Sequence, residues 1–187
     1  VDGDWKSLEG SLVFAGNTFV AVHLPVLLLT DAPRPTCVLV ASMTAVLVTT
    51  IEALSPRGTD NLFVPFAVYV VLDRATLAQV DELVRLNLML LAIFGGIAFI
   101  AWRTRAFNVG GTLAFILFAY VLWALGSPLW AMPVFTGFLF YTAVRVIARP
   151  PANRPAITRV GTVVRAFVAP LTIHLASYFS RADDFFF

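Results

Sequence analysis

The chain has 187 residues, of which 59% are hydrophobic and only 13% are charged, and its mean hydropathy is +0.87. Soluble domains are about 45–50% apolar and about 25% charged, so this composition excludes an ordinary soluble domain and predicts an integral membrane protein. The only cysteine, Cys37, excludes an intrachain disulfide and a metal site built from several cysteines.

Apolar runs along the chain predict the membrane helices. A helix needs about 20 residues to cross about 30 Å of hydrocarbon, and all but one of the runs approach that length. The short run, 62–72, crosses only if it borrows flanking residues such as Asn61 and Asp73, or packs inside the bundle. Period-two alternation typical of a membrane barrel is absent, so we expect an all-α, polytopic membrane helix bundle of about six to seven transmembrane helices. The runs cover residues 11–30, 36–54, 62–72, 83–101, 108–125, 129–148 and 160–179.

A polar stretch, VDGDWKSLEGS, precedes the first apolar run. Its lysine, hydroxyls and glycines next to a helix start suit the binding of phosphate, because the ammonium supplies charge and backbone N–H groups supply donors. On chemistry alone, an ordinary juxtamembrane lysine fits this pattern better. The candidate phosphate-binding residues are Lys6, Ser7, Glu9, Gly10 and Ser11.

The first run contains His23 and Pro25. His23 is either a proton carrier or metal ligand, or a histidine hydrogen-bonded within the bundle, and the second reading is favoured. Pro25 predicts a kink or an early end of the helix.

The second run, 36–54, is rich in small and hydroxyl-bearing residues, which allow close packing of helices in lipid. We therefore expect this helix to be central in the bundle. It ends with Glu52, and Pro56 and Gly58 predict the break that follows. The small and hydroxyl-bearing residues are Ala41, Ser42, Thr44, Ala45, Thr49 and Thr50.

The loop after this run brings two carboxylates, Glu52 and Asp60, next to Asn61. Charge within a membrane protein is costly, so such a cluster predicts a functional site. Two plainer readings stay open: Glu52 as an acid at the membrane interface and Asp60 as a helix N-cap.

The basic residues predict which side of the membrane each loop faces. Assigning loops alternately across seven crossings gives one side nine basic residues and the other side four, and the richer side is cytoplasmic by the positive-inside rule. This places the polar loops around Lys6 and Asp60 in the cytosol, in the inner or plasma membrane of a prokaryote or the endoplasmic reticulum or plastid membrane of a eukaryote. The nine are Lys6, Arg57, Arg103, Arg105, Arg145, Arg149, Arg154, Arg159 and Arg165, and the four are Arg34, Arg74, Arg85 and Arg181.

The two polar elements together resemble the C-terminal part of the dolichol kinase and phytol kinase family. These are CTP-dependent polyprenol and lipid-alcohol kinases, distantly related to phosphatidate cytidylyltransferase. The family has a Lys-Ser/Thr-x-Glu-Gly-Ser/Thr element before one membrane helix and a Glu…Asp-Asn-x-x-x-Pro element after the next. The likeness covers residues 1–72, without the family's upstream Gly-Asp nucleotide element. The matching residues are Lys6, Ser7, Glu9, Gly10 and Ser11 in the first element and Glu52, Asp60, Asn61 and Pro65 in the second.

This resemblance implies Mg²⁺- and CTP-dependent phosphorylation of a membrane lipid alcohol, namely dolichol or another polyprenol, phytol or diacylglycerol. It implies a membrane lipid and a nucleotide as partners, with no nucleic acid. Lys6 and the residues up to Ser11 would bind the nucleotide phosphates. Glu52 and Asp60 would hold the metal, or one of them would accept the proton of the alcohol, and Asn61 would orient phosphate or water. The helix at 36–54 would line a lipid groove.

The rest of the chain is expected to form a polar connector and a second membrane block. The connector, DRATLAQVDELVR, is expected to place Leu77, Val80 and Val84 on one face. The second block weakly resembles the phytyl-phosphate kinase family, through a glycine-containing helix start and a Gly-to-Trp turn within FNVGGTLAFILFAYVLWALGSPLWAMPVF. From the two chain ends we also expect a fragment of a longer protein. The expected domains are 1–72, 73–85 and 86–187.

Two other functions remain open. One keeps the fold and joins CTP to a lipid phosphate, as a phosphatidate cytidylyltransferase does. The other is a non-enzymatic transporter or assembly subunit whose polar loop is structural, for which Glu52→Gln and Asp60→Asn would be silent.

Overall fold

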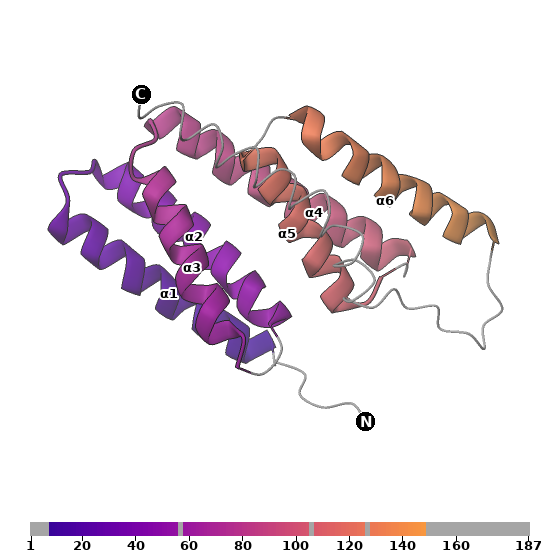
Figure 1. Ribbon diagram of the computed structural model, residues 1–187, viewed down its shortest axis with the longest axis horizontal. Helices are drawn as coiled ribbons and strands as arrows, with labels where there is room; N and C mark the ends of the chain where they lie inside the picture. The colour runs from indigo at the N-terminus through magenta and orange to yellow at the C-terminus, as the bar shows by residue number, and fades with distance from the viewer. Residues whose placement is uncertain (1–7, 56–57, 105–106, 126–127, 149–187) are drawn as a thin grey trace. The chain divides into compact units, whose positions relative to one another are not determined.

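The computed structural model describes residues 8–55, 58–104, 107–125 and 128–148, which form helices without any strand (Figure 1). This confirms the all-α prediction for these residues, and the expected run at 160–179 lies outside them. The chain divides into an N-terminal unit, Val1–Leu90, and a C-terminal unit, Leu91–Phe187, with the division inside α4. The helices are α1 (Leu8–Leu29), α2 (Arg34–Leu54), α3 (Asp60–Ala75), α4 (Val80–Thr104), α5 (Val109–Leu125) and α6 (Pro128–Ala148).

Three of the described helices are long and apolar enough to cross a membrane: Glu9–Leu29 within α1, α2 and α4. They are compatible with an integral membrane protein. The 16 residues of α3 extend about 24 Å, which is less than the hydrocarbon thickness of about 30 Å. Length and composition therefore support three spans in this part of the chain, and the count of six to seven stays a prediction.

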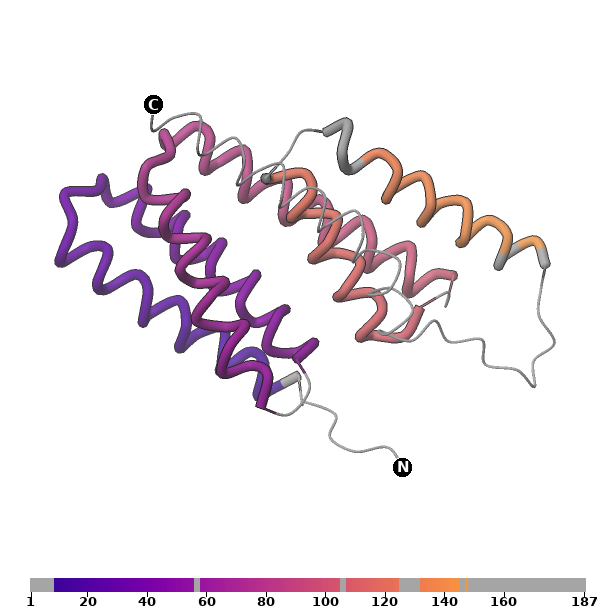
Figure 2. Tube along the Cα trace, in the orientation of Figure 1, coloured from indigo at the N-terminus to yellow at the C-terminus, as the bar shows by residue number. Residues whose placement is uncertain are grey.

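The first two helices form an antiparallel hairpin (Figure 2). Residues 30–33 connect them, a length typical of neighbouring antiparallel helices. The Thr30 hydroxyl donates to the Val26 carbonyl oxygen and accepts the Ala32 N–H, so it closes the end of α1. Contrary to one expectation, α1 does not end at Pro25 but continues to Leu29.

The second helix is the centre of the N-terminal unit, as its small residues predict. It packs against both α1 and α3. Half of the residues in its membrane-spanning segment are buried, compared with 11% of those in the spanning segment of α1. Two threonine hydroxyls of α2 donate to the carbonyl oxygen four residues earlier, Thr44 to Val40 at 2.7 Å and Thr50 to Val46 at 2.7 Å, so they are satisfied inside an apolar helix. The buried hydroxyl of Thr49 has no hydrogen-bond partner among the described residues.

The start of α4 is bound to α2 by a side-chain amide. Nδ2 of Asn87 donates to the Leu39 carbonyl oxygen of α2 at 3.3 Å and to the Leu83 carbonyl oxygen of its own helix at 2.9 Å. The buried face here contains Leu83 and Leu90. The expected face of Leu77, Val80 and Val84 is wrong, because Leu77 precedes the helix and is 83% exposed, and Val84 is exposed as well.

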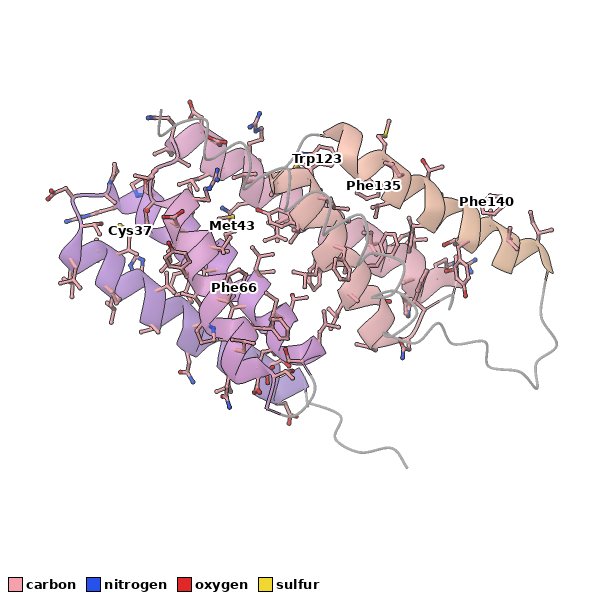
Figure 3. The ribbon with its side chains drawn as sticks, viewed as in Figure 1. Cys37, Met43, Phe66, Trp123, Phe135 and Phe140 are labelled. Atoms are coloured by element: carbon pink, nitrogen blue, oxygen red, sulfur yellow. The ribbon has the colours of Figure 1, made fainter. Side chains whose placement is uncertain are left out.

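Aromatic rings pack the C-terminal unit. The centroid of the Phe107 ring lies 5.3 Å from that of the Phe138 ring and 5.1 Å from that of the Tyr141 ring. The ring centroids of Phe115 and Phe138 are 4.7 Å apart. Trp123 of α5 meets the Phe135 ring of α6 edge-on at 6.3 Å (Figure 3). Such contacts fix how α5 and α6 pack.

Candidate functional site

The turn between α2 and α3 brings the two predicted carboxylates together. α2 ends where the Ser55 N–H donates to the carbonyl oxygens of Ile51 at 2.9 Å and Glu52 at 3.2 Å. Ser55 is extended, and Gly58 has a φ of +84°, a left-handed conformation that suits glycine. The chain therefore reverses quickly, which confirms the predicted break, and α3 begins beside the end of α2.

Asp60 is the first residue of α3 and not its N-cap. The cap position is occupied by Thr59, whose carbonyl oxygen accepts the N–H groups of Leu62 at 3.1 Å and Phe63 at 3.0 Å. The prediction of Asp60 as the cap is therefore wrong. A carboxylate in the first helical turn is nevertheless favourable, because it faces the positive end of the helix dipole.

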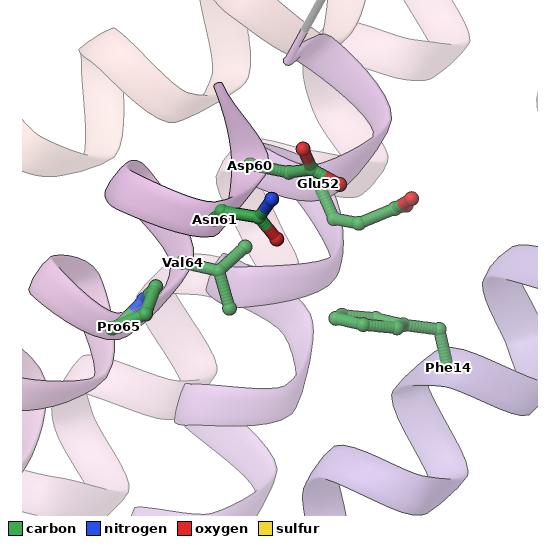
Figure 4. Close-up of a pocket in the computed structure, with 6 residues that line it drawn as sticks. All are labelled: Phe14, Glu52, Asp60, Asn61, Val64 and Pro65. Atoms are coloured by element: carbon green, nitrogen blue, oxygen red, sulfur yellow. The ribbon is translucent and has the colours of Figure 1, made fainter. Parts of the chain in front are cut away.

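A pocket of about 200 Å³ contains both carboxylates and the amide of Asn61 (Figure 4). Glu52 comes from the last turn of α2, and Asp60 and Asn61 come from the first turn of α3. Glu52 and Asp60 are half-buried, whereas Asn61 is exposed. The structure thus brings together three of the predicted site residues from two helices.

The rest of the pocket wall is apolar: Pro65 belongs to the predicted Glu…Asp-Asn-x-x-x-Pro element, whereas Phe14 and Val64 were not predicted. Phe14 points into the pocket from α1, opposite Val64 and Pro65 of α3 (Figure 4). Two signals for these residues were present in the sequence. Phe14 follows the predicted phosphate-binding residues by one helical turn, and Val64 and Pro65 lie three and four residues after Asn61, on the same helix face.

The prediction that the helix at 36–54 lines a lipid groove is not supported by this pocket. Glu52 is the only residue of α2 in the pocket lining. The small residues of α2, such as Ala41 and Thr44, are fully buried in the unit instead. Small side chains at this helix allow neighbouring helices to approach, which removes them from any open groove.

Part of the predicted phosphate-binding element lies at the same end of the N-terminal unit as the pocket (Figure 1). Glu9 and Gly10 are exposed and Ser11 is half-buried in the first turn of α1. None of the three lines this pocket, but Phe14 follows Ser11 by three residues and connects the two regions along one helix face. Lys6 and Ser7 lie outside the described residues.

The pocket fits the ligand requirements of Mg²⁺. In proteins Mg²⁺ takes one or two carboxylates and keeps water or substrate phosphate oxygens as further ligands. Glu52 and Asp60 supply such a pair. Within residues 8–55, 58–104, 107–125 and 128–148, no group of three or more His, Cys, Asp or Glu side chains assembles, so a metal held here would take its other ligands from water or phosphate.

His23 is the other candidate for proton or metal chemistry. It lies on α1 and is not among the residues that line the pocket. Its ring stacks on Phe19 with centroids 5.4 Å apart. Its Nδ1 is buried and has no hydrogen-bond partner among the described residues, so the expected hydrogen bond is not found at this atom.

Comparison with protein-family models, curated proteins and solved structures gave no match for this chain.

Proposed function

We propose that the chain phosphorylates a membrane lipid alcohol, with CTP as the phosphoryl donor and Mg²⁺ as the metal. The observation that carries this proposal is the pocket in which Glu52, Asp60 and Asn61 meet an apolar wall. A lipid-alcohol kinase needs these two surfaces together, because the phosphates require charge stabilisation and the acceptor carries a hydrocarbon chain. The choice of CTP rests on the resemblance to the dolichol and phytol kinase family.

In the proposed reaction, the hydroxyl oxygen of the alcohol attacks the γ-phosphorus of CTP. The bond from that phosphorus to the β–γ bridging oxygen breaks, CDP leaves, and the hydroxyl proton passes to a carboxylate. Phosphoryl transfer depends mainly on positioning and on charge stabilisation. Mg²⁺, when bound, supplies positive charge to the phosphates.

The chain's own residues take the following roles in this proposal. Glu52 and Asp60 both hold the metal, or one of them holds it while the other accepts the proton of the alcohol. Asn61, exposed at the rim, orients a phosphate oxygen or a metal-bound water. Lys6 and the polar residues up to Ser11 bind the nucleotide phosphates at the start of α1, on the side of the membrane assigned to the cytosol by the positive-inside rule.

The test is transfer of ³²P from γ-labelled CTP, with Mg²⁺, in membranes that contain the full chain. Polyprenol, phytol and diacylglycerol are offered as acceptors, and Lys6→Ala and Asp60→Asn serve as inactivated variants. Label in an extractable lipid that is lost in both variants supports the proposal. Formation of a CDP-lipid from α-labelled CTP would replace it with a cytidylyltransferase, and absence of transfer from either label would overturn both.

A further inference from the structure

One side of α1 is left open by the packing of the N-terminal unit. The helix packs mainly against α2, and its buried side chains are Val22 and Val26. Only 11% of the residues in its membrane-spanning segment are buried, although this segment is long and apolar enough to cross a membrane. The open side therefore faces either hydrocarbon or another helix.

The open side carries a regular row of residues, which we call the α1 seam: Val13, Asn17, Val20 and Leu24. Val13, Val20 and Leu24 are 64%, 51% and 46% exposed, and Asn17 is exposed as well. The steps of four, three and four residues are those of the a and d positions of a coiled coil. At about 100° per residue, the four positions fall within one narrow sector of the helix, opposite its buried side.

Asn17 is a polar residue near the middle of this span. It lies eight residues after Glu9 and twelve before Leu29, the two ends of the span, so it is about 12 Å and about 18 Å from them along the helix. Its side-chain amide makes no hydrogen bond to the described residues. An unpaired amide in hydrocarbon costs free energy, so this position requires a partner that can both donate and accept hydrogen bonds.

A second copy of the chain meets this requirement. Two copies insert in the same orientation, so their α1 helices are parallel, and a two-fold axis along the membrane normal places each residue opposite itself. An asparagine amide donates and accepts, so two Asn17 side chains can pair with each other. The chain has no Asp, Glu, Lys or Arg between Glu9 and Asp31, so two such helices do not repel each other by charge.

We infer that the α1 seam is the interface of a homodimer, in which the Asn17 amides of two copies hydrogen-bond across the two-fold axis. Asparagine at a single a position is known to fix the register and the number of helices in a coiled coil, and polar side chains bond across helices in membranes. The inference does not rest on the proposed function, because no residue of the α1 seam lines the pocket.

Disulfide cross-linking in membranes maps this interface. The full chain carries Cys37→Ala, which removes its only cysteine, together with either Val13→Cys or the control Leu12→Cys. Val13 and Leu12 are equally exposed, at 64%, but their side chains leave the helix about 100° apart. Oxidation with copper phenanthroline should convert Val13→Cys into a disulfide-linked dimer and leave Leu12→Cys monomeric. Equal cross-linking of the two variants would overturn the inference.

Energy transfer between donor- and acceptor-labelled copies tests the role of Asn17. Measured in phospholipid vesicles over a series of protein-to-lipid ratios, it gives the dissociation constant of the dimer. Asn17→Leu should raise this constant about threefold to thirtyfold, the range for hydrogen bonds between membrane helices. Asn17→Gln, which keeps the amide, should raise it less, and Leu12→Ala, outside the α1 seam, should leave it unchanged.

The remaining outcomes separate this inference from the proposed function. Absence of energy transfer between copies of the unchanged chain would overturn the inference and assign the α1 seam to lipid or to a different helix. A dissociation constant that is unaffected by Asn17→Leu, or equally affected by Leu12→Ala, would overturn it as well. The measurements use neither nucleotide nor acceptor, so a dimer with these properties and no ³²P transfer would support the interface and refute only the proposed function.

Discussion

The two units of the chain are both apolar and helical, but only the N-terminal unit contains carboxylates within its helices. Glu52 and Asp60 meet in a pocket there, whereas the sequence has no Asp or Glu between Glu82 and Asp183. The described part of the C-terminal unit is packed instead by the rings of Phe107, Phe115, Phe138 and Tyr141. Composition alone makes the two halves look alike, and only the positions of a few charges distinguish them.

Under the proposed function, the two units have separate tasks. A carboxylate inside an apolar helix bundle costs free energy, so it is retained where it acts on a ligand. Stacked and tilted aromatic rings add packing free energy without a ligand. We therefore expect loss of the carboxylates in the first unit to change chemistry and loss of a packed ring in the second unit to change stability.

The largest effect should follow loss of the carboxylate pair. Glu52→Gln and Asp60→Asn should each lower ³²P transfer by about 10²- to 10⁴-fold, the range for loss of a positioned acid or base. Because both act on one phosphoryl group, the double variant should be little worse than the poorer single variant. Initial rates at several Mg²⁺ concentrations measure this, and partial recovery at high Mg²⁺ identifies the variant that lost a metal ligand.

The control for the pair is Asp73→Asn, because Asp73 is an exposed acid near the opposite end of α3. Its transfer rate should match that of the unchanged protein. Equal losses in Asp73→Asn and Asp60→Asn would show that any acid on α3 matters, and silent Glu52→Gln and Asp60→Asn variants would favour the non-enzymatic reading.

Removal of a ring from the aromatic cluster should affect stability instead. Phe138 is 2% exposed, and its ring contacts those of Phe107 and Phe115. Phe138→Ala should reduce the free energy of unfolding by about 3 kcal/mol, measured by unfolding in detergent. Phe140→Ala on the same helix, where the side chain is 70% exposed and labelled in Figure 3, should cost far less. Similar losses for both would contradict a packed core at Phe138.

The sequence predicted the helices well but their buried faces poorly. Length and hydropathy are enough to place helices such as α1 and α2, and small residues identified α2 as central. The face of a helix that is apolar all round is harder to predict, because lipid is as apolar as the protein interior. For this reason Phe14 was missed as a wall of the pocket. Leu83 was missed as a buried residue of α4 because the predicted face began at Leu77, whereas the helix begins at Val80.

The turn at Gly58 should tolerate a side chain less well than a helix does. A Cβ at Gly58 would meet no atom within 4 Å, so the cost of Gly58→Ala comes only from its φ of +84°. We expect about 1–2 kcal/mol of destabilisation. Gly16→Ala is the matched control, because Gly16 lies within α1 and also has free space; alanine there should be neutral or stabilising. Equal effects would mean that the left-handed turn does not depend on glycine.

The smallest effect is expected from Asn87, whose amide connects α4 to the Leu39 carbonyl oxygen of α2. Hydrogen bonds between membrane helices contribute about 0.6 kcal/mol on average, so Asn87→Leu should lower stability by about that amount. In the C-terminal unit, Asn108 makes a local bond instead, accepting the Gly111 N–H at 2.7 Å before α5, and Asn108→Ala should cost about 1 kcal/mol as lost helix caps do.

Asn87 also tests whether stability and chemistry are separable in the first unit. Leu39 precedes Glu52 by thirteen residues of α2, which is about 20 Å along the helix. If the carboxylates are positioned by the α2–α3 turn alone, Asn87→Leu should leave ³²P transfer unchanged while it lowers the unfolding midpoint. A fall in transfer larger than the fall in folded protein would mean that the packing of α4 on α2 positions Glu52 as well, so that the pocket depends on four helices and not on three.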